Sequence, residues 1–143
     1  MGRVLLATNA GADARVLPVA ALRRAEEAGL DLAIVHVLSG EDYAAQADQM
    51  KSAIKSETEW LIHTMLALAE ERSGVGSVEV SVHLREGDVA DELVEFAAST
   101  SPTVVLVGVP RASDHSEFTD VQFAEMLDRL SRSDIAVEQV KTD

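Results

Sequence analysis

The sequence contains no cysteine, which excludes disulfides, thiolate metal sites and cysteine nucleophiles. Aromatic residues are scarce, with one Trp, one Tyr and three Phe, so an aromatic platform for stacking is not expected. No run of about 18 apolar residues occurs, and the first residues contain neither the apolar region nor the cleavage site of a signal peptide. These absences predict a cytoplasmic protein that is not inserted in a membrane.

Basic residues are also few. The chain has 25 acidic and 12 basic residues, which gives a formal net charge of −13. Nucleic acids and anionic membranes are bound through Lys and Arg side chains that neutralise phosphates, so we expect no nucleic-acid partner. The length of 143 residues predicts one domain, residues 1–143, with an ordinary core. Such a domain can stand alone or belong to a longer chain.

The most informative part of the sequence is the segment from residue 78 to residue 111. Apolar and polar residues alternate from Val78 to Leu84, which predicts a strand with one solvated face. Gly87 ends this strand, and Asp88 is a favourable N-cap for a following helix. The apolar residues of that helix recur at helical spacing and are Val89, Leu93, Phe96 and Ala97.

The same segment ends in a continuous apolar run over residues 103–109. A short, β-branched run of this kind predicts a strand that is buried on both faces in the middle of a parallel sheet. Gly108 lies at the carboxyl end of this strand. In open α/β sheets, ligands usually bind at that end of the strands.

The remaining segments repeat the alternation of strands and helices. Apolar runs predict strands at Arg3–Thr8, Leu30–Leu38 and Ile135–Val140, and helices are expected near 15–28, 43–72 and 120–132. Pro18 marks either the start of the first of these helices or a kink in it. Residues 42–51 form either a separate short helix or a mobile lead-in to the long helix. The apolar stripe of the long helix is expected at Ile54, Leu61, Met65 and Leu68.

Strands that alternate with helices predict an α/β fold with a mostly parallel sheet. The continuous apolar runs of the first and fourth strands suit the centre of the sheet, and the charged alternation of the third suits an edge. We therefore predict a single open, doubly wound, parallel five-stranded sheet in the order 3-2-1-4-5, with helices on both faces.

No residue set in the sequence predicts catalysis or a metal site. The four histidines show none of the spacings of metal-binding motifs, and no GxSxG motif occurs. A phosphoacceptor receiver domain would need an acidic pair after the first strand, where the chain has Asn9 and Ala10. Asp114, Glu117 and Asp120 could bind a hard cation, although a solvated acidic loop is the simpler interpretation. We therefore expect that the protein is not an enzyme and that it binds no metal ion.

Four motifs along the chain resemble the universal stress protein (UspA-like) family. They are VLLATNAGAD at 4–13, LDLAIVHVL at 30–38, REGDV at 85–89 and TVVLVGV at 103–109. The resemblance spans the whole chain in order and length. It implies a regulatory or interaction module of the stress response, without catalytic activity.

Members of this family that bind ATP have a glycine pattern after the fourth strand, Gly-x2-Gly-x9-Gly followed by Ser or Thr. Here Gly108 fills the first position, but Arg111, Val121 and Gln122 fill the others, and the chain has no glycine after Gly108. Such glycines let backbone N–H groups approach the phosphate oxygens without a Cβ in the way. We therefore predict that the protein has no cofactor and does not bind ATP. The family aspartate that contacts ribose is replaced by Asn9.

An ATP- or AMP-binding switch remains the alternative, because part of the family's cleft is kept. By the resemblance, the candidate nucleotide-binding residues are Thr8, Asn9, Val37, Gly108 and Arg111. Thr8 and Val37 remain compatible with an adenine. Arg111 could grip an anionic ligand, although we favour an ion pair with an acidic residue of its own loop.

The resemblance also implies a homodimer, which in this family often forms through the last strand. Glu138 and Gln139 interrupt the apolar pattern of that strand, and charged residues on edge strands hinder pairing. The mode of dimerisation therefore stays open, with a contact through helices or a monomer as alternatives.

Overall fold

The computed structural model describes residues 2–8, 16–108 and 120–140. In chain order, its elements are β1 (Arg3–Ala7), α1 (Leu17–Ala28), β2 (Asp31–Leu38), α2 (Glu41–Ala44), α3 (Asp48–Ser73), β3 (Val80–Glu86), α4 (Val89–Thr100), β4 (Val104–Gly108), α5 (Asp120–Arg132) and β5 (Val137–Val140). Their bounds differ by a few residues from those that the sequence predicts.

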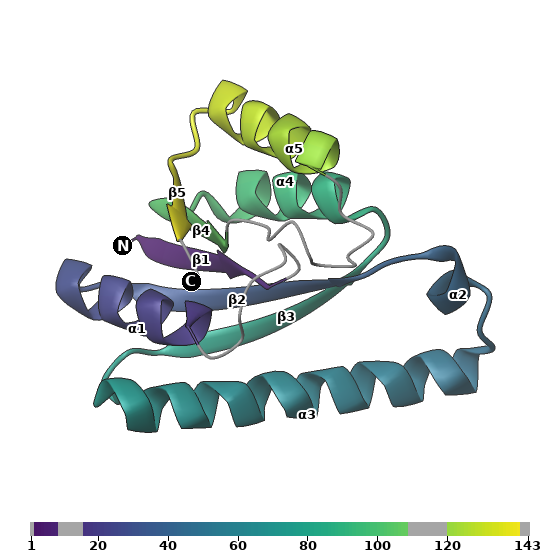
Figure 1. The fold of residues 1–143 in the computed structure, drawn as a ribbon, viewed down its shortest axis with the longest axis horizontal. Coiled ribbons are helices and arrows are strands. Elements are labelled where there is room, and N and C mark those ends of the chain that lie inside the picture. Colours follow the sequence, from purple (N-terminus) through teal and green to yellow (C-terminus); the bar gives the residue numbers. More distant parts are fainter. Residues whose placement is uncertain (1, 9–15, 109–119, 141–143) are drawn as a thin grey trace.

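The five strands form one parallel sheet in the order β3-β2-β1-β4-β5, which confirms the predicted fold and strand order (Figure 1). β1 and β4 lie side by side in the middle, with Leu6 opposite Leu106. Both strands are almost completely buried, because their apolar runs face helices on either side of the sheet.

Two apolar cores lie on opposite faces of the sheet. One core joins the sheet to α1 and α3, and the other joins it to α4 and α5. Successive residues of β1 alternate between them, with Leu5 in the core under α4 and α5 and Leu6 in the core under α1 and α3. Figure 1 shows the two pairs of helices on either side of the strands.

The ends of the helices follow from local sequence. α1 begins at Leu17 with a proline in its first turn, so Pro18 starts the helix and does not kink it. Gly29 ends it in the left-handed conformation, with φ of 67°. Asp88 caps α4 as predicted, because its Oδ1 accepts a hydrogen bond of 2.9 Å from the backbone N–H of Asp91.

The region of the long helix contains two helices. A single turn, α2, precedes the 26-residue α3, so the separate short helix is the alternative that the structure adopts. None of the described helices is long and apolar enough to span a membrane.

The predicted apolar stripe of α3 is wrong in part. The buried residues are Ile62, Leu66 and Ala69, whereas Leu61 and Leu68 are each 48% exposed. The stripe that we expected lies beside the face that contacts the sheet and α1, because both faces of this helix carry apolar residues.

The predicted solvated face of β3 is also wrong in part. His83 lies half-buried on this face, with its ring centroid 4.9 Å from that of Phe96 of α4. The guanidinium of Arg85 lies 5.8 Å from the same ring and pairs with Glu92 at 3.2 Å. Two polar side chains of this edge strand, His83 and Arg85, are therefore partly covered by contacts with α4, whereas Ser81 and Glu86 are exposed.

Candidate functional site

Three of the predicted site residues lie at the carboxyl edge of the sheet. Ala7, the last residue of β1, is in register with Val35 of β2 and Val107 of β4, so Thr8 and Gly108 end adjacent strands. Val37 lies on β2, which continues past β1, and its side chain is 1% exposed. The order of strands reverses between β1 and β4, the position where ligands bind in this class of sheet. The other two residues, Asn9 and Arg111, lie outside the described residues.

Thr8 makes specific polar contacts with β2. Its backbone N–H donates to the carbonyl of Val35 at 3.1 Å, and its hydroxyl Oγ1 lies 2.7 Å from Nδ1 of His36. Burial lowers the pKa of His36, which favours the neutral imidazole. These contacts fix Thr8, directly after β1, against β2. The sequence shows His36 only as a separate histidine, because its contact with Thr8 depends on strand pairing.

A pocket of about 740 Å³ lies at the same edge of the sheet, at the ends of β2 and β3. This volume is typical of small-molecule sites. It lies between α2 and the start of α4 and is lined by Leu38, Ser39, Gly40, Glu41, Tyr43, Ala44, Lys51, Glu86, Gly87, Asp88 and Val89. Thr8, Val37 and Gly108 do not line this pocket. The candidate nucleotide-binding residues that the structure describes therefore lie at the same edge of the sheet as the pocket but are not part of it.

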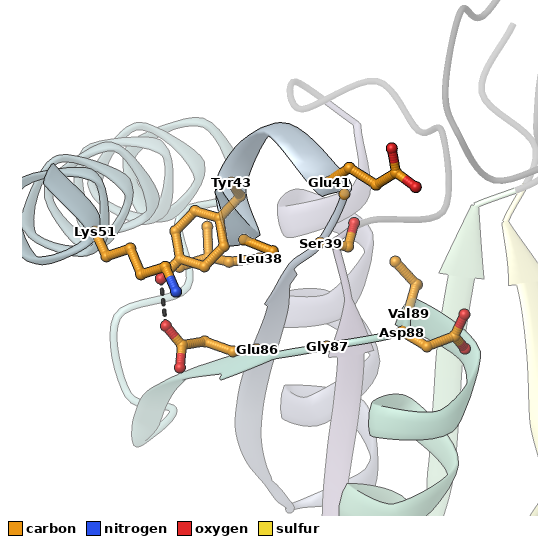
Figure 2. A pocket seen from close by; sticks show the side chains of 11 residues that line it. Leu38, Ser39, Glu41, Tyr43, Lys51, Glu86, Gly87, Asp88 and Val89 are labelled. Carbon is orange, nitrogen blue, oxygen red and sulfur yellow. Dashed lines mark hydrogen bonds between the residues drawn. The ribbon is translucent and has the colours of Figure 1, made fainter. Parts of the chain in front are cut away.

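One wall of the pocket is a hydrogen-bonded network around Glu86, the last residue of β3 (Figure 2). The hydroxyl of Tyr43 donates to the Glu86 carboxylate, which also pairs with Lys55 at 2.9 Å. The ammonium of Lys51 lies 5.6 Å from the centre of the Tyr43 ring. Glu86 therefore connects α2 and α3 to the end of β3.

The network shifts the pKa of both partners. The hydrogen bond from Tyr43, followed by that from Lys55, lowers the pKa of Glu86. Partial burial, followed by the hydrogen bond to the Glu86 carboxylate, raises the pKa of Tyr43 to about 12. The contact between them is therefore kept across neutral pH.

The opposite wall of the pocket is the turn that leads into α4. Gly87 has a φ of 137°, a backbone conformation that residues with a side chain rarely adopt. Its N–H donates to the carbonyl of Leu38 at 3.1 Å. Asp88 then caps the helix, and Val89 supplies an apolar side chain beside it (Figure 2). The pocket thus combines apolar walls with carboxylates of Glu41, Glu86 and Asp88.

Tyr43 offers a direct test of this network because it is the only tyrosine in the chain. We expect its absorbance at 295 nm to titrate near pH 12, and in the variant Glu86→Gln to titrate at a lower pH, closer to the usual value of about 10. The neutral phenol is favoured in the folded chain, so its contribution to stability is present below about pH 10 and is lost as the pH rises toward 12. An unchanged midpoint in Glu86→Gln would show that the contact with Glu86 does not perturb Tyr43.

Sequence reasoning missed Tyr43, Lys51 and Glu86 as parts of a site. No motif connects them, since they come from three elements that only strand pairing brings together. Among the described residues, no group of three or more His, Asp or Glu side chains could hold a metal ion. Asp114 and Glu117 of the predicted acidic loop lie outside the described part, and the structure describes no side chain of Asp120.

The fold and the position of the pocket define a doubly wound α/β domain with a cleft at the carboxyl edge of its sheet. The model of the universal stress protein family matches residues 1–137. The chain therefore belongs to the universal stress protein family. A comparison with curated proteins finds no match.

Solved structures of universal stress proteins share the fold. One in complex with cAMP has a TM-score of 0.65 and 19% identity, covering 99% of this chain and 98% of that one. A protein from Archaeoglobus fulgidus in complex with dAMP has a TM-score of 0.62 and 16% identity, with coverages of 99% and 98%. A family protein from Burkholderia pseudomallei has a TM-score of 0.62 and 20% identity, with coverages of 97% and 95%. At these identities, the likeness concerns the fold.

Proposed function

We propose that this chain is a cytoplasmic regulatory or interaction module of the universal stress protein family that does not hold ATP. The observation that carries the proposal is the replacement of the phosphate-binding glycines. Val121, which replaces the last of these glycines, lies in the first turn of α5 and is 67% exposed, and Gln122 replaces the Ser or Thr that follows it. A branched side chain here prevents the close approach of backbone N–H groups to a phosphate that glycine allows.

The charge of the neighbouring pocket supports the same conclusion. Glu41, Glu86 and Asp88 line it, and Lys51 is the one basic residue among its described lining residues. Lys55 already neutralises Glu86 from outside the lining. A triphosphate would meet net negative charge, which opposes its binding. The pocket is better suited to a ligand that is neutral or cationic.

A thermal unfolding experiment with nucleotides tests the proposal. We expect no change in Tm when ATP is added at millimolar concentration. A ligand at a hundred times its Kd would stabilise the folded chain by about 2.7 kcal/mol, which such an experiment detects easily. A clear rise in Tm with ATP would contradict the proposal.

Binding of a monophosphate such as AMP is the second candidate function. Structures of the same fold in complex with cAMP and dAMP favour it, as do Thr8 and Gly108 at the switch point of the sheet and Val37 on the neighbouring strand β2. A nucleoside monophosphate has no β- or γ-phosphate, so its binding does not require contacts to those groups. In the same experiment, a rise in Tm with AMP and none with ATP would support this second candidate.

A further inference from the structure

The pocket between α2 and the start of α4 is large enough for a small molecule, and its walls are held in place. Its volume is about 740 Å³, and Thr8, Val37 and Gly108 are not among its lining residues. The turn after β3 is fixed by the hydrogen bond of 3.1 Å from the N–H of Gly87 to the carbonyl of Leu38. The pocket is therefore a formed site that is separate from the candidate nucleotide-binding residues of the described part.

Apolar side chains supply part of the lining of the pocket. Leu38, at the end of β2, is 8% exposed. Val89, the first residue of α4, packs against the core under α4 and α5, and the half-buried ring of Tyr43 belongs to α2. An apolar part of a ligand would gain free energy by leaving water for this surface.

The charged residues of the pocket fall into two groups, which Figure 2 shows on opposite sides. On one side, the carboxylate of Glu86 pairs with Lys55 at 2.9 Å, and Lys51 belongs to the same network. On the other side lie the carboxylates of Glu41 and Asp88. The negative charge of Glu86 is therefore balanced, and the two remaining carboxylates decide which ligands the pocket accepts.

Glu41 and Asp88 have no compensating cation within the described part of the chain. The carboxylate of Glu41 has neither a hydrogen bond nor an ion pair there, and that of Asp88 accepts one hydrogen bond, from the N–H of Asp91. A metal ion would need further oxygen ligands, and no group of three or more His, Asp or Glu side chains among the described residues could hold one. An anion would be repelled, and a neutral molecule would leave both charges uncompensated. These conditions favour an organic cation.

We propose that this pocket binds a small organic ammonium ion, with the charged group at the carboxylates of Glu41 and Asp88. The apolar part of the ligand lies against Leu38, Val89 and the ring of Tyr43. An ammonium group can donate hydrogen bonds to both carboxylates, and the apolar lining strengthens their attraction because it lowers the local dielectric constant. The inference goes beyond the proposed function, since it depends on the lining of this pocket and not on the loss of the phosphate-binding glycines.

An NMR titration with phenyl compounds that differ in charge tests the proposal. In proton–nitrogen correlation spectra of the full chain, phenethylammonium should shift the amide signals of Gly40 and Gly87, which line the pocket, and leave that of Gly108 unchanged. For a probe of this size we expect a Kd of about 1 mM. Phenethyl alcohol, which is neutral, and hydrocinnamate, which is anionic, should bind at least about tenfold more weakly. Methylammonium, which lacks the apolar part, should also bind at least about tenfold more weakly.

Two conservative variants test the position of the charged group. Glu41→Gln and Asp88→Asn each remove one charge and keep the size of the side chain, and asparagine still caps a helix. Each should raise the Kd of phenethylammonium by about tenfold. Glu71→Gln is the matched control, because it removes the same charge at an exposed position of α3 that does not line the pocket, and it should leave the Kd unchanged. Circular dichroism checks that the variants are folded.

Several results would overturn the proposal. They are the absence of saturable shifts with phenethylammonium, shifts centred on Gly108 instead of Gly40 and Gly87, equal binding of the three phenyl compounds, and a Kd that neither Glu41→Gln nor Asp88→Asn changes. Binding of ATP is measured separately. A chain that binds ATP would contradict the proposed function and would leave this inference to its own measurements.

Discussion

The substitution Leu6→Ala should lower the free energy of unfolding by about 3–5 kcal/mol, a large part of the roughly 5–15 kcal/mol expected for a domain of this size. Leu6 is 0% exposed and lies on the central strand β1, in register with Ile34 of β2 and Leu106 of β4. Truncation removes buried methyl groups and leaves a cavity that neighbouring strands on both sides cannot fill, because their backbones are fixed by the sheet. Chemical denaturation measures the change.

Val121→Ala is the control for this experiment. It also truncates an apolar side chain, but at a position that is 67% exposed on α5, and we expect a change within about 0.5 kcal/mol. A loss of less than about 1 kcal/mol in Leu6→Ala would show that β1 is not at the centre of the packed sheet.

The substitution Phe96→Ala should cost about 3–5 kcal/mol and should also change the titration of His83. Phe96 is 6% exposed on α4 and contacts the ring of His83 and the guanidinium of Arg85. Burial, followed by the charges of Arg3 and Arg85, lowers the pKa of His83. Without the aromatic ring, water reaches the imidazole, so the pKa of His83 should rise toward its usual value of about 6.5.

Denaturation and an NMR titration of the histidine ring protons measure the two effects. Phe96→Leu, which keeps an apolar side chain over His83, should cost less stability and should leave the pKa of His83 closer to that of the original chain. An unchanged His83 pKa in Phe96→Ala would show that α4 does not cover the outer strand.

The fold could be predicted because its central strands are determined by local sequence. The continuous apolar runs of β1 and β4 admit only a buried position, and the interrupted pattern of β3 indicates an edge. The prediction of which side chains are buried was wrong in part where both faces of an element carry residues that can be buried. The α3 stripe and the polar face of β3 are the examples, since Leu61 turned out exposed and His83 half-buried.

The positions of three candidate residues in the sheet could be predicted from the sequence. Thr8 follows the apolar run of β1, Gly108 ends that of β4, and Val37 lies one residue before the end of β2, so all three lie toward the carboxyl edge. The pocket beside them depends on contacts between residues that lie 43 positions apart, such as Tyr43 and Glu86, and no local pattern encodes that pairing. Family resemblance directs attention to the β1 and β4 ends, whereas the pocket lies at the β2 and β3 ends.

Isothermal titration calorimetry of the purified chain with ATP tests the central claim most directly. The absence of the later glycines and the acidic lining of the pocket predict no binding heat at millimolar ATP. A saturable binding heat with a stoichiometry of one ATP per chain would contradict the claim that this member of the family lacks a binding site for the triphosphate.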